Sequence, residues 1–463
     1  MTREPFDLSG KHVVVLGAGR SGLAAVDLLV SRGATVTLSD TAAGPAPALD
    51  RLRALGVRVD IGPHVEDLLR RADLIVLSPG VSPMQAAVAT ARLAGVPVIG
   101  EVELASRFLQ GRVIAVTGTK GKSTTTTLIA RMLQRGGFTV TAGGNLGTAL
   151  STQVVDSQPD TIHVVEVSSF QLETIATFRP WIAVLLNLSA DHLDRHATFD
   201  EYAASKARIF ENQTADDYAV VNADDAAALA LAGGIAKRFD FALDAPIEDG
   251  VTVAGELVVE RRAGAMRPLF PVSAVRLTGR HLLADALAAG AVASLAGVPV
   301  EAMQRALATF TGLEHALEPV AEIGGVRFVN DSKATNIVAV RRSIESFDRG
   351  VVVIMGGRYK GGSFEDLRES LQRRATGVVA IGESAPLIHA ALGDALPVRD
   401  AGSMAEAVRE AFALAGPGGV VLLAPACSSF DMFPDYSARG RAFKDEVGKL
   451  AQDQGARAGV RQG

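Results

Sequence analysis

Residues 113–124 read Val-Ile-Ala-Val-Thr-Gly-Thr-Lys-Gly-Lys-Ser-Thr, an apolar run that passes directly into a Gly- and Thr-rich turn. The apolar run is typical of a buried strand, and the glycines allow a tight turn whose main-chain N–H groups point at phosphate oxygens. Lys122 would neutralise charge on the β- and γ-phosphates, and the Ser123 hydroxyl would bind Mg²⁺. Val116 stands where the usual eight-residue motif has its first Gly, so a loop without function is the alternative. The residues predicted to bind ATP here are Gly118, Thr119, Lys120, Gly121, Lys122, Ser123 and Thr124.

On both sides of this stretch, short β-rich runs alternate with helical patterns, which is typical of parallel α/β domains. With 463 residues, the chain is too long for one hydrophobic core. We therefore predict an α/β protein of three domains: a Rossmann-like N-terminal domain (1–101), a central P-loop ATPase domain with a parallel sheet (102–312) and a Rossmann-like C-terminal domain (313–463). A small β insertion is expected between about 240 and 280, and the polar tail is expected to fray after Leu450.

Composition places the chain among ordinary α/β proteins and excludes several functions. Hydrophobic residues make up 48% and charged residues 21%, and the formal net charge is −5, so no basic surface for nucleic acid is expected. The longest weakly polar run, 286–300, is shorter than the roughly 20 apolar residues that a membrane span needs. The acidic amino terminus is unlike a signal peptide. The single cysteine, Cys427, cannot form a disulfide within the chain, so we expect a cytoplasmic protein, and we expect it to be a monomer.

A second Gly-rich turn follows the first apolar run of the chain. Gly17, Gly19 and Gly22 have the spacing of the dinucleotide-binding fingerprint, and Asp40 ends the next β-rich run. This pattern puts a diphosphate at a helix N-terminus, with a ribose or base near Asp40. It leaves open NAD, another diphosphate nucleotide, or simple close packing of a strand and a helix.

Acidic and imidazole side chains follow the next apolar runs of the central domain. Glu166 interrupts the run 162–167 near its carboxyl end, where a buried carboxylate needs a partner or a metal ion. Asp191 and His192 follow another apolar run and are candidate metal ligands beside Glu166. Lys206 lies on the following predicted helix, and from its residue pattern alone it is expected to be a solvated lysine.

Polar loops also follow the strands expected in the C-terminal domain. Asp331 and Lys333 come directly after the run 326–329. Asp331 would accept hydrogen bonds from ribose hydroxyls, and Lys333 would pair with an anionic substrate or a phosphate. An ordinary capped turn is the alternative, because Asn, Asp, Ser and Thr are common in turns. Two further strand-end loops, 356–362 and 426–433, supply basic and hydroxyl groups in the same domain.

These motifs, in this order, resemble the Mur ligase family over essentially the whole chain. Residues 331–336 (Asp-Ser-Lys-Ala-Thr-Asn) and 166–173 (Glu-Val-Ser-Ser-Phe-Gln-Leu-Glu) are similar to those of members that add glutamate. The resemblance implies an ATP-dependent ligase of peptidoglycan precursor synthesis, which joins D-glutamate to UDP-N-acetylmuramoyl-L-alanine through an acyl phosphate. It also implies a UDP rather than an NAD ligand for the N-terminal domain, and an amino-acid site in the C-terminal domain.

The resemblance assigns roles to individual residues. Lys206 matches a lysine that is carbamylated in this family, so it would become a carboxylate-like ligand at one of two Mg²⁺ sites. The catalytic residues implied are Lys122, Glu166, His192 and Lys206, and the metal ligands implied are Ser123, Glu166, His192 and Lys206. Nucleotide or phosphate contacts are implied for His315, Asp331 and Lys333. Contacts with the UDP precursor or with glutamate are implied for Gly19, Arg20, Ser21, Asp40, Ser78, Asn145, Lys333, Thr335, Lys360, Ser429, Phe430 and Tyr436.

Three positions depart from the family pattern. Ala316 replaces an Arg that usually follows the residue matching His315, and Leu282 and Asp285 replace a pair of Asn residues, so the nucleotide contacts are expected to differ. Three alternatives remain: a folylpolyglutamate synthase-like ligase that shares the ATPase core, an NAD-dependent oxidoreductase built on the first Gly-rich turn, and a binding protein without activity. Ligation of L-glutamate in place of D-glutamate is also open, because the sequence does not set stereochemistry.

Overall fold

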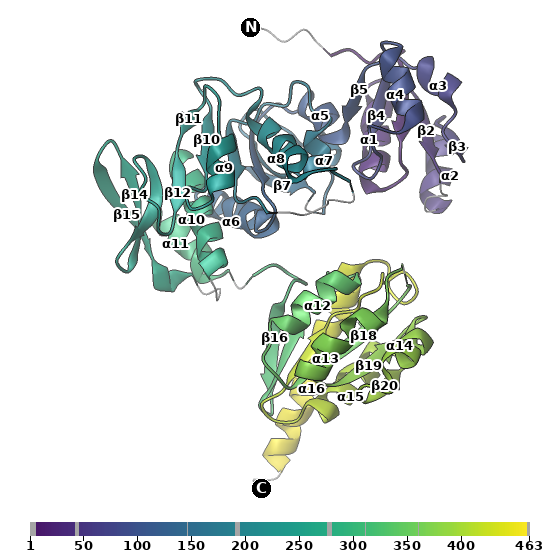
Figure 1. Ribbon diagram of the computed structural model, residues 1–463, viewed down its shortest axis with the longest axis vertical. Coiled ribbons are helices and arrows are strands. Elements are labelled where there is room, and N and C mark those ends of the chain that lie inside the picture. Colours follow the sequence, from purple (N-terminus) through teal and green to yellow (C-terminus); the bar gives the residue numbers. More distant parts are fainter. Residues whose placement is uncertain are drawn as a thin grey trace. The chain divides into compact units, whose positions relative to one another are not determined.

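The computed structural model describes residues 6–41, 46–145, 147–189, 195–275, 280–310, 312–359 and 361–460. The chain divides into two compact units, 1–310 and 311–463. The first unit holds two parallel sheets and a small mixed sheet, and the second holds one sheet with helices on both faces (Figure 1).

The sheet nearest the amino terminus is parallel throughout, with the order β3-β2-β1-β4-β5. Its strands are β1 (His12–Leu16), β2 (Thr35–Asp40), β3 (Arg58–Ile61), β4 (Leu74–Leu77) and β5 (Val98–Gly100), and its helices are α1 (Arg20–Ser31), α2 (Ala46–Ala54), α3 (Glu66–Arg70) and α4 (Ala86–Leu93). Successive strands are added on one side of β1 (β2, β3) and then on its other side (β4, β5). The gap between β1 and β4, where this order switches, is where α/β folds place their ligands. The first Gly-rich turn therefore lies at the switch point of this sheet.

The P-loop strand β6 lies in the middle of the second parallel sheet, whose order is β11-β10-β9-β6-β8-β7. Its strands are β6 (Arg112–Thr117), β7 (Val140–Gly144), β8 (Ile162–Glu166), β9 (Ile182–Leu185), β10 (Tyr218–Val221) and β11 (Lys237–Arg238). The helices are α5 (Glu101–Ser106), α6 (Lys122–Arg135), α7 (Ser169–Leu172), α8 (Phe199–Ala207), α9 (Ala226–Leu231), α10 (Arg280–Leu295) and α11 (Val300–Ala308), with short 3₁₀ turns η1 (Leu150–Gln153), η2 (Arg208–Phe210) and η3 (Val272–Ala274). Because the central strands are buried on both faces, they read as continuous apolar runs.

The predicted β insertion is confirmed. It is a four-stranded sheet of β12 (Asp240–Ala242), β13 (Gly250–Ala254), β14 (Leu257–Arg262) and β15 (Ala265–Pro271). α10 packs against both α6 and this sheet, so it joins the insertion to the helix that follows the P-loop.

The second unit has a six-stranded sheet with the order β16-β17-β21-β18-β19-β20, in which only the edge strand β16 is antiparallel among the strands described. Its strands are β16 (Glu318–Ile323), β17 (Val326–Asn330), β18 (Val351–Gly356), β19 (Ala375–Ile381), β20 (Val398–Ala401) and β21 (Val420–Leu423). Its helices are α12 (Ile337–Glu345), α13 (Arg368–Arg374), α14 (Ala385–Leu392), α15 (Met404–Ala415) and α16 (Tyr436–Val460), with the 3₁₀ turn η4 (Phe364–Leu367).

The expectation of fraying after Leu450 is wrong, because α16 continues to Val460. Phe443, Val447 and Leu450 recur at helical spacing and are buried against the sheet of the second unit. Tertiary packing of these three side chains thus stabilises α16 up to Leu450.

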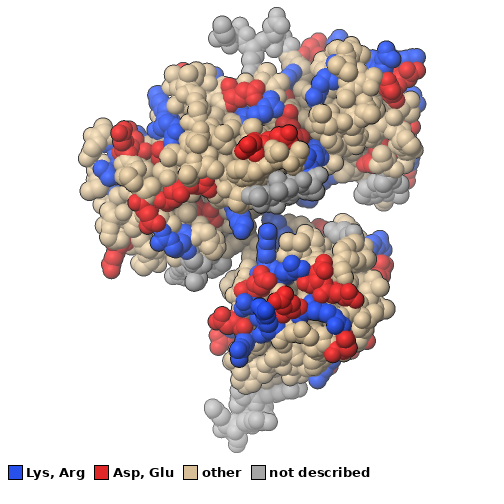
Figure 2. Space-filling model, in the orientation of Figure 1, with Lys and Arg blue, Asp and Glu red and all other residues tan. Residues whose placement is uncertain are grey.

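The predicted α/β class is confirmed, with three largely parallel sheets in the predicted order along the chain. The domain limits at 101 and 312 stay a prediction. None of the helices in the described part of the chain is long and apolar enough to cross a membrane. On the face drawn in Figure 2, acidic and basic side chains are interspersed over each unit.

Candidate active site

The loop between β6 and α6 has the backbone of a phosphate cradle. Gly118 and Gly121 have φ angles of +149° and +82°, which favour glycine, and a methyl group on Gly118 would lie 2.9 Å from Cβ of Leu186. α6 begins at Lys122, so its first N–H groups have no partners inside the helix. The Lys122 ammonium folds back over the loop and donates to the carbonyl oxygens of Gly118 (3.0 Å) and Thr119 (2.9 Å). Positive charge and the N–H groups of a helix N-terminus are therefore concentrated at one point.

Glu166 meets this loop at the end of the neighbouring strand. β6 and β8 pair in parallel with Val116 opposite Glu166, so both strands end at the same edge of the sheet. The Glu166 carboxylate is only 2% exposed; it accepts hydrogen bonds from Ser123 Oγ (2.6 Å) and from Asn145 Nδ2 (2.7 Å). A hydroxyl and a carboxylate at this separation are the hard oxygen ligands that Mg²⁺ prefers, so the residues present fit a magnesium site.

Lys206 is buried beside the same loop, so the expectation of a solvated lysine is wrong. Its side chain is 2% exposed, its ammonium donates to the Gly118 carbonyl at 2.8 Å, and Nζ lies 4.7 Å from the centre of the Tyr202 ring. Thr198 caps α8 by accepting a hydrogen bond from the Glu201 N–H, and residues 202 and 206 lie one turn apart on its inward face. The packing of α8, rather than the local pattern, determines where Lys206 lies.

His192, the remaining predicted metal ligand, lies outside the described residues. Within the ranges that the structure describes, no three His, Cys, Asp or Glu side chains converge as a metal site. The site seen is thus Ser123 and Glu166, with Asn145 bonded to the same carboxylate and Lys206 bonded to the Gly118 carbonyl.

Two residues that brace the P-loop were missed from the sequence. Asn187 follows β9; its carbonyl accepts from Thr119 N–H, and its side chain accepts from Lys120 N–H, both at 2.9 Å. The Tyr202 hydroxyl lies 3.0 Å from Thr119 Oγ1. Asn187 could have been found from the sequence, because it follows a buried strand directly. Tyr202 could not, because its contact depends on which face of α8 is buried.

The first Gly-rich turn lines a cavity of about 500 Å³ in the first unit. A side chain at Gly22 would collide with the Gly17 carbonyl, so the third glycine allows close strand–helix packing. Asp40 Oδ2 accepts the Ala18 N–H at 2.5 Å, and Arg20 donates to the carbonyl of Gly147. The predicted substrate residues that line this cavity are Gly19, Arg20, Ser21, Asp40, Ser78 and Asn145. His64, which sequence reasoning missed, lines it as well.

In the second unit, three strand-end loops meet at one edge of the sheet. β21 lies between β17 and β18, and the loops are joined by hydrogen bonds from Ala426 N to Ala334 O and from Arg358 N to Ser428 O, both at 3.0 Å. Of the predicted residues here, Lys333 is exposed, Thr335 and Tyr436 are half-buried, Ser429 is buried and Phe430 is 64% exposed. Lys360 lies outside the described residues.

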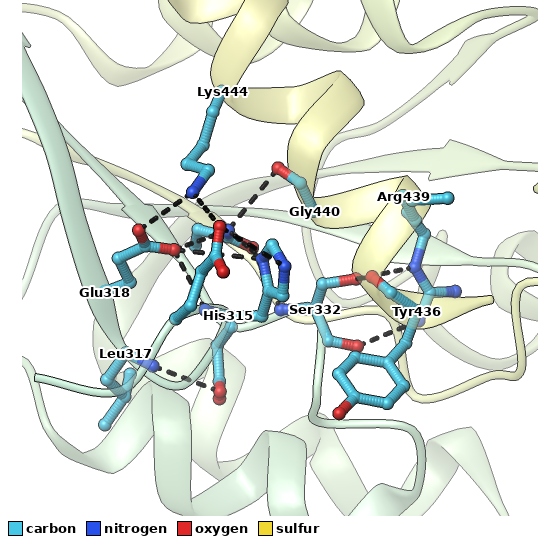
Figure 3. Close-up of polar contacts among 12 residues, drawn as sticks. His315, Leu317, Glu318, Ser332, Tyr436, Arg439, Gly440 and Lys444 are labelled. Carbon is cyan, nitrogen blue, oxygen red and sulfur yellow. Dashed lines mark hydrogen bonds and ion pairs between the residues drawn. The ribbon is translucent and has the colours of Figure 1, made fainter. Parts of the chain in front are cut away.

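His315 is buried in the second unit, and its hydrogen-bond partners belong to the same unit (Figure 3). Its Nδ1 faces the Asn330 amide at 2.8 Å, its backbone has φ of +64°, and a side chain at Gly440 would collide with its ring. Its Nε2 has no hydrogen-bond partner among the residues described. Burial lowers the pKa of His315, against the raising influence of Glu314 and Glu318.

Asp331 is also buried, and burial raises its pKa. One carboxylate oxygen accepts the Leu317 N–H at 3.2 Å and the other accepts the Ser343 hydroxyl. A ribose would therefore have to share oxygens that already have donors within the unit. The predicted ribose contact stays a prediction.

α16 supplies two cations that the sequence did not single out. The Arg439 side chain is 1% exposed and donates to Ser332 Oγ (3.0 Å), Ser332 O (3.0 Å) and Cys427 O (3.1 Å). Burial lowers its pKa to about 10. Lys444 Nζ lies 2.6 Å from Glu314 and 3.1 Å from Glu318, so it joins the two carboxylates on either side of His315.

Three family models match successive parts of the chain. Residues 11–100 match the Mur ligase MurD-like N-terminal domain, 116–293 the Mur ligase middle domain and 317–427 the Mur ligase glutamate ligase domain. The UDP-N-acetylmuramoylalanine–D-glutamate ligase of Acidobacterium capsulatum is 46% identical over 447 residues, which cover 96% of this chain and 97% of the relative. The chain belongs to the Mur ligase family. The ligase of the same name from Koribacter versatilis is 43% identical, over 97% of this Mur ligase and 100% of the relative.

Solved structures share the fold at lower identity. UDP-N-acetylmuramate-alanine ligase MurC from Thermotoga maritima has a TM-score of 0.55 at 19% identity, covering 95% of this chain and 100% of its own. A pseudomurein peptide ligase type C from Methanothermus fervidus has a TM-score of 0.52 at 16% identity, with the same coverage. These likenesses support the architecture of this Mur ligase and carry no information about its substrate.

Proposed function

We propose that this Mur ligase joins D-glutamate to UDP-N-acetylmuramoyl-L-alanine, with ATP converted to ADP and phosphate. The observation that carries the proposal is the 2.6 Å contact between Ser123 of the P-loop and the buried Glu166. An NAD-dependent oxidoreductase does not need a P-loop serine bonded to a buried carboxylate, so this contact argues against that alternative. The names of the relatives and the match of residues 11–100 support the UDP precursor over a folate.

Amide formation from a carboxylate and an ammonium group is uphill in water, so the alanyl carboxylate must first be activated. It takes the γ-phosphoryl group of ATP and becomes an acyl phosphate. The glutamate amine then attacks the acyl carbon, and the tetrahedral intermediate expels phosphate. Lys122 and the first N–H groups of α6 hold the phosphates and offset the charge that develops during transfer.

Two Mg²⁺ ions would neutralise the phosphate and carboxylate oxygens that come together in this reaction. Ser123 and Glu166 are the ligands we assign to one ion, with Asn145 orienting the carboxylate. We assign Glu166, His192 and carbamylated Lys206 to the other. A carbamate gives Lys206 a negative charge, which accounts for a buried lysine next to a cation site.

The substrates are divided among three sites. The cavity lined by Arg20, Asp40 and Ser78 would bind the UDP moiety, and the edge that carries Thr335 and Ser429 would bind glutamate. These residues belong to different units, so we expect turnover to involve domain closure. We assign the reaction to the cytoplasm and to a monomer, with neither nucleic acid nor membrane as a partner.

An amino-acid panel tests the proposal. ADP formation is measured with ATP, Mg²⁺ and UDP-N-acetylmuramoyl-L-alanine, with D-Glu, L-Glu and other amino acids offered in turn. We expect turnover with D-Glu, and none when the precursor is replaced by a folate. Equal or faster turnover with L-Glu would overturn the stereochemical assignment, and absence of ADP formation with every amino acid would support the binding-protein alternative.

The carbamate role has its own test in Lys206→Ala. We expect loss of turnover that added short carboxylates, such as formate or acetate, partly restore, because they can occupy the place of the carbamate. Lys237→Ala, which removes a lysine from the edge strand β11, is the matched control and should need no rescue. Near-normal turnover by untreated Lys206→Ala enzyme would exclude the carbamate.

A further inference from the structure

Asp285 is a buried acid that the mechanism above does not use. It lies on α10, its side chain is 5% exposed, and within the described chain it has neither an ion pair nor a hydrogen bond of ordinary length. A methyl group built on Gly121 would collide with its carboxyl oxygen, so this oxygen lies directly against the last residue before α6. The carboxyl group thus occupies the positive end of the helix to which the phosphates of ATP are assigned.

Apart from the N-terminal end of α6, which favours a carboxylate, the surroundings of Asp285 supply little support for a negative charge. The hydroxyl of Thr125, one turn into α6, has no other hydrogen-bond partner among the residues described, and it is the one side chain found to favour the ionised form. Burial outweighs this influence and raises the pKa of Asp285 to about 8. A carboxylate without a cation is costly to bury, so the neutral acid is the stable form near pH 7.

No charged group on the neighbouring elements changes this balance. α10 packs against α6, β10, β12, β13 and β14. The other charged and titratable groups on these elements and on α10 are Lys122, Arg131, Arg135, Tyr218, Asp240, Glu260, Arg261, Arg262, Arg280 and His281. None of them acts on the pKa of Asp285. Lys122 is bonded to loop carbonyls, Asp240 is paired with Arg238, and Arg280 is paired with Asp244.

We propose that Asp285 sets the pH range over which this enzyme binds ATP: its neutral carboxyl group packs against the P-loop, whereas its carboxylate repels the triphosphate. Asp285 is a positioning residue, because it acts through Gly121 and the start of α6. The inference rests on the proposed assignment of ATP to residues 118–124.

The sign of the effect follows from linkage. A triphosphate at the N-terminus of α6 adds negative charge near Asp285, so bound nucleotide favours the protonated acid. The affinity for ATP is then highest at a pH below the pKa that Asp285 has in the nucleotide-free protein, and it falls as pH rises through this pKa. If only the acid form binds, the dissociation constant rises about tenfold per pH unit above this pKa.

The test is direct titration of ATP by calorimetry, without the UDP precursor, at about pH 6.5 and about pH 9. For the unaltered protein, we expect the dissociation constant at the higher pH to be about tenfold larger than at the lower pH. Asp285→Asn has the same shape and no charge, so its own ratio between the two values should stay below about threefold. A control variant, Asp240→Asn, removes a different partly buried carboxylate and should keep the ratio of the unaltered protein.

Thr125→Val gives a second measurement that does not alter Asp285. Without the hydroxyl that favours the carboxylate, the loss of affinity should begin at a higher pH. An unaltered protein with the same affinity at both pH values, or an Asp285→Asn protein with the same ratio as the unaltered one, would overturn the inference while leaving the ATP site intact. Failure of every protein to bind ATP at either pH would overturn the proposed function itself.

Discussion

The P-loop centre (Lys122, Ser123, Glu166 and Lys206) and the α16 cluster (His315, Arg439 and Lys444 with their partners) both bury charged side chains, but they satisfy them differently. In the P-loop centre, two ammonium groups bond to the carbonyls of one loop, and Glu166 bonds to a hydroxyl and an amide. In the α16 cluster, Arg439 and Lys444 join segments more than 100 residues away in the chain.

The difference teaches which groups are available to a ligand. A phosphate can take the place of the loop carbonyls as the partner of Lys122, and a metal ion can take the place of the hydrogen bond between Ser123 and Glu166. Neither exchange disturbs the sheet. Removing Arg439 would instead leave three buried acceptors without donors, each of which costs free energy in the folded state. We therefore expect changes in the P-loop centre to alter catalysis and changes in the α16 cluster to alter stability.

The largest expected effect is that of Lys122→Ala on turnover. Loss of the ammonium group removes charge stabilisation during phosphoryl transfer, so kcat should fall by about 10³-fold or more. Since Lys122 donates to carbonyls of its own loop, the melting temperature should change by no more than about 2 °C. Steady-state kinetics and calorimetry on the same preparation would separate the two quantities. A large fall in melting temperature would contradict the expectation that changes in the P-loop centre alter catalysis rather than stability.

The next effect is that of Arg439→Met on stability. The substitution keeps much of the volume but removes the donors for Ser332 and Cys427, so the free energy of unfolding of the second unit should fall by about 3 kcal/mol. Urea unfolding followed by circular dichroism would measure it. An enzyme that keeps its unfolding free energy yet loses turnover would give Arg439 a role at the active site instead.

The smallest expected effect is a difference in the free energy of unfolding between variants at two lysines of α16. Lys444 is 26% exposed and bridges Glu314 and Glu318, whereas Lys449 is 67% exposed and pairs only with Glu446 among the ion pairs described. Lys444→Met should lower the free energy of unfolding by about 1 kcal/mol, because two carboxylates then face each other without a cation. Lys449→Met is the matched control, and it should leave the urea midpoint unchanged. Equal effects would mean that the bridge contributes nothing beyond an ordinary surface pair.

Much of the P-loop centre could be predicted from the sequence. Glu166 and the loop at 118–123 each follow an apolar run, and the carboxyl ends of parallel strands gather at one edge of a sheet. Their contact was therefore accessible before any coordinates were known. The same reasoning brought together the first Gly-rich turn and Asp40, and the three loops of the second unit; Ser78 and Asn145 came only from the resemblance to the family.

The burial of Lys206, Asp285 and Arg439 could not be predicted from their own segments. A long polar side chain on a helix is solvated or buried according to what packs against that helix, and the partners come from distant parts of the chain. Lys206 depends on the Gly118 carbonyl, 88 residues before it, and Arg439 depends on Ser332, 107 residues before it. No local pattern encodes these distances.

The sequence by itself determined where the strands end and which glycines and polar groups follow them, because hydrophobic periodicity and turn chemistry are local properties. The tertiary structure alone decided which charged groups lose water and which partners replace it. Desolvation depends on atoms brought in by other segments, and it makes Asp285 a weak acid. The packing of α8 places Lys206 beside the P-loop.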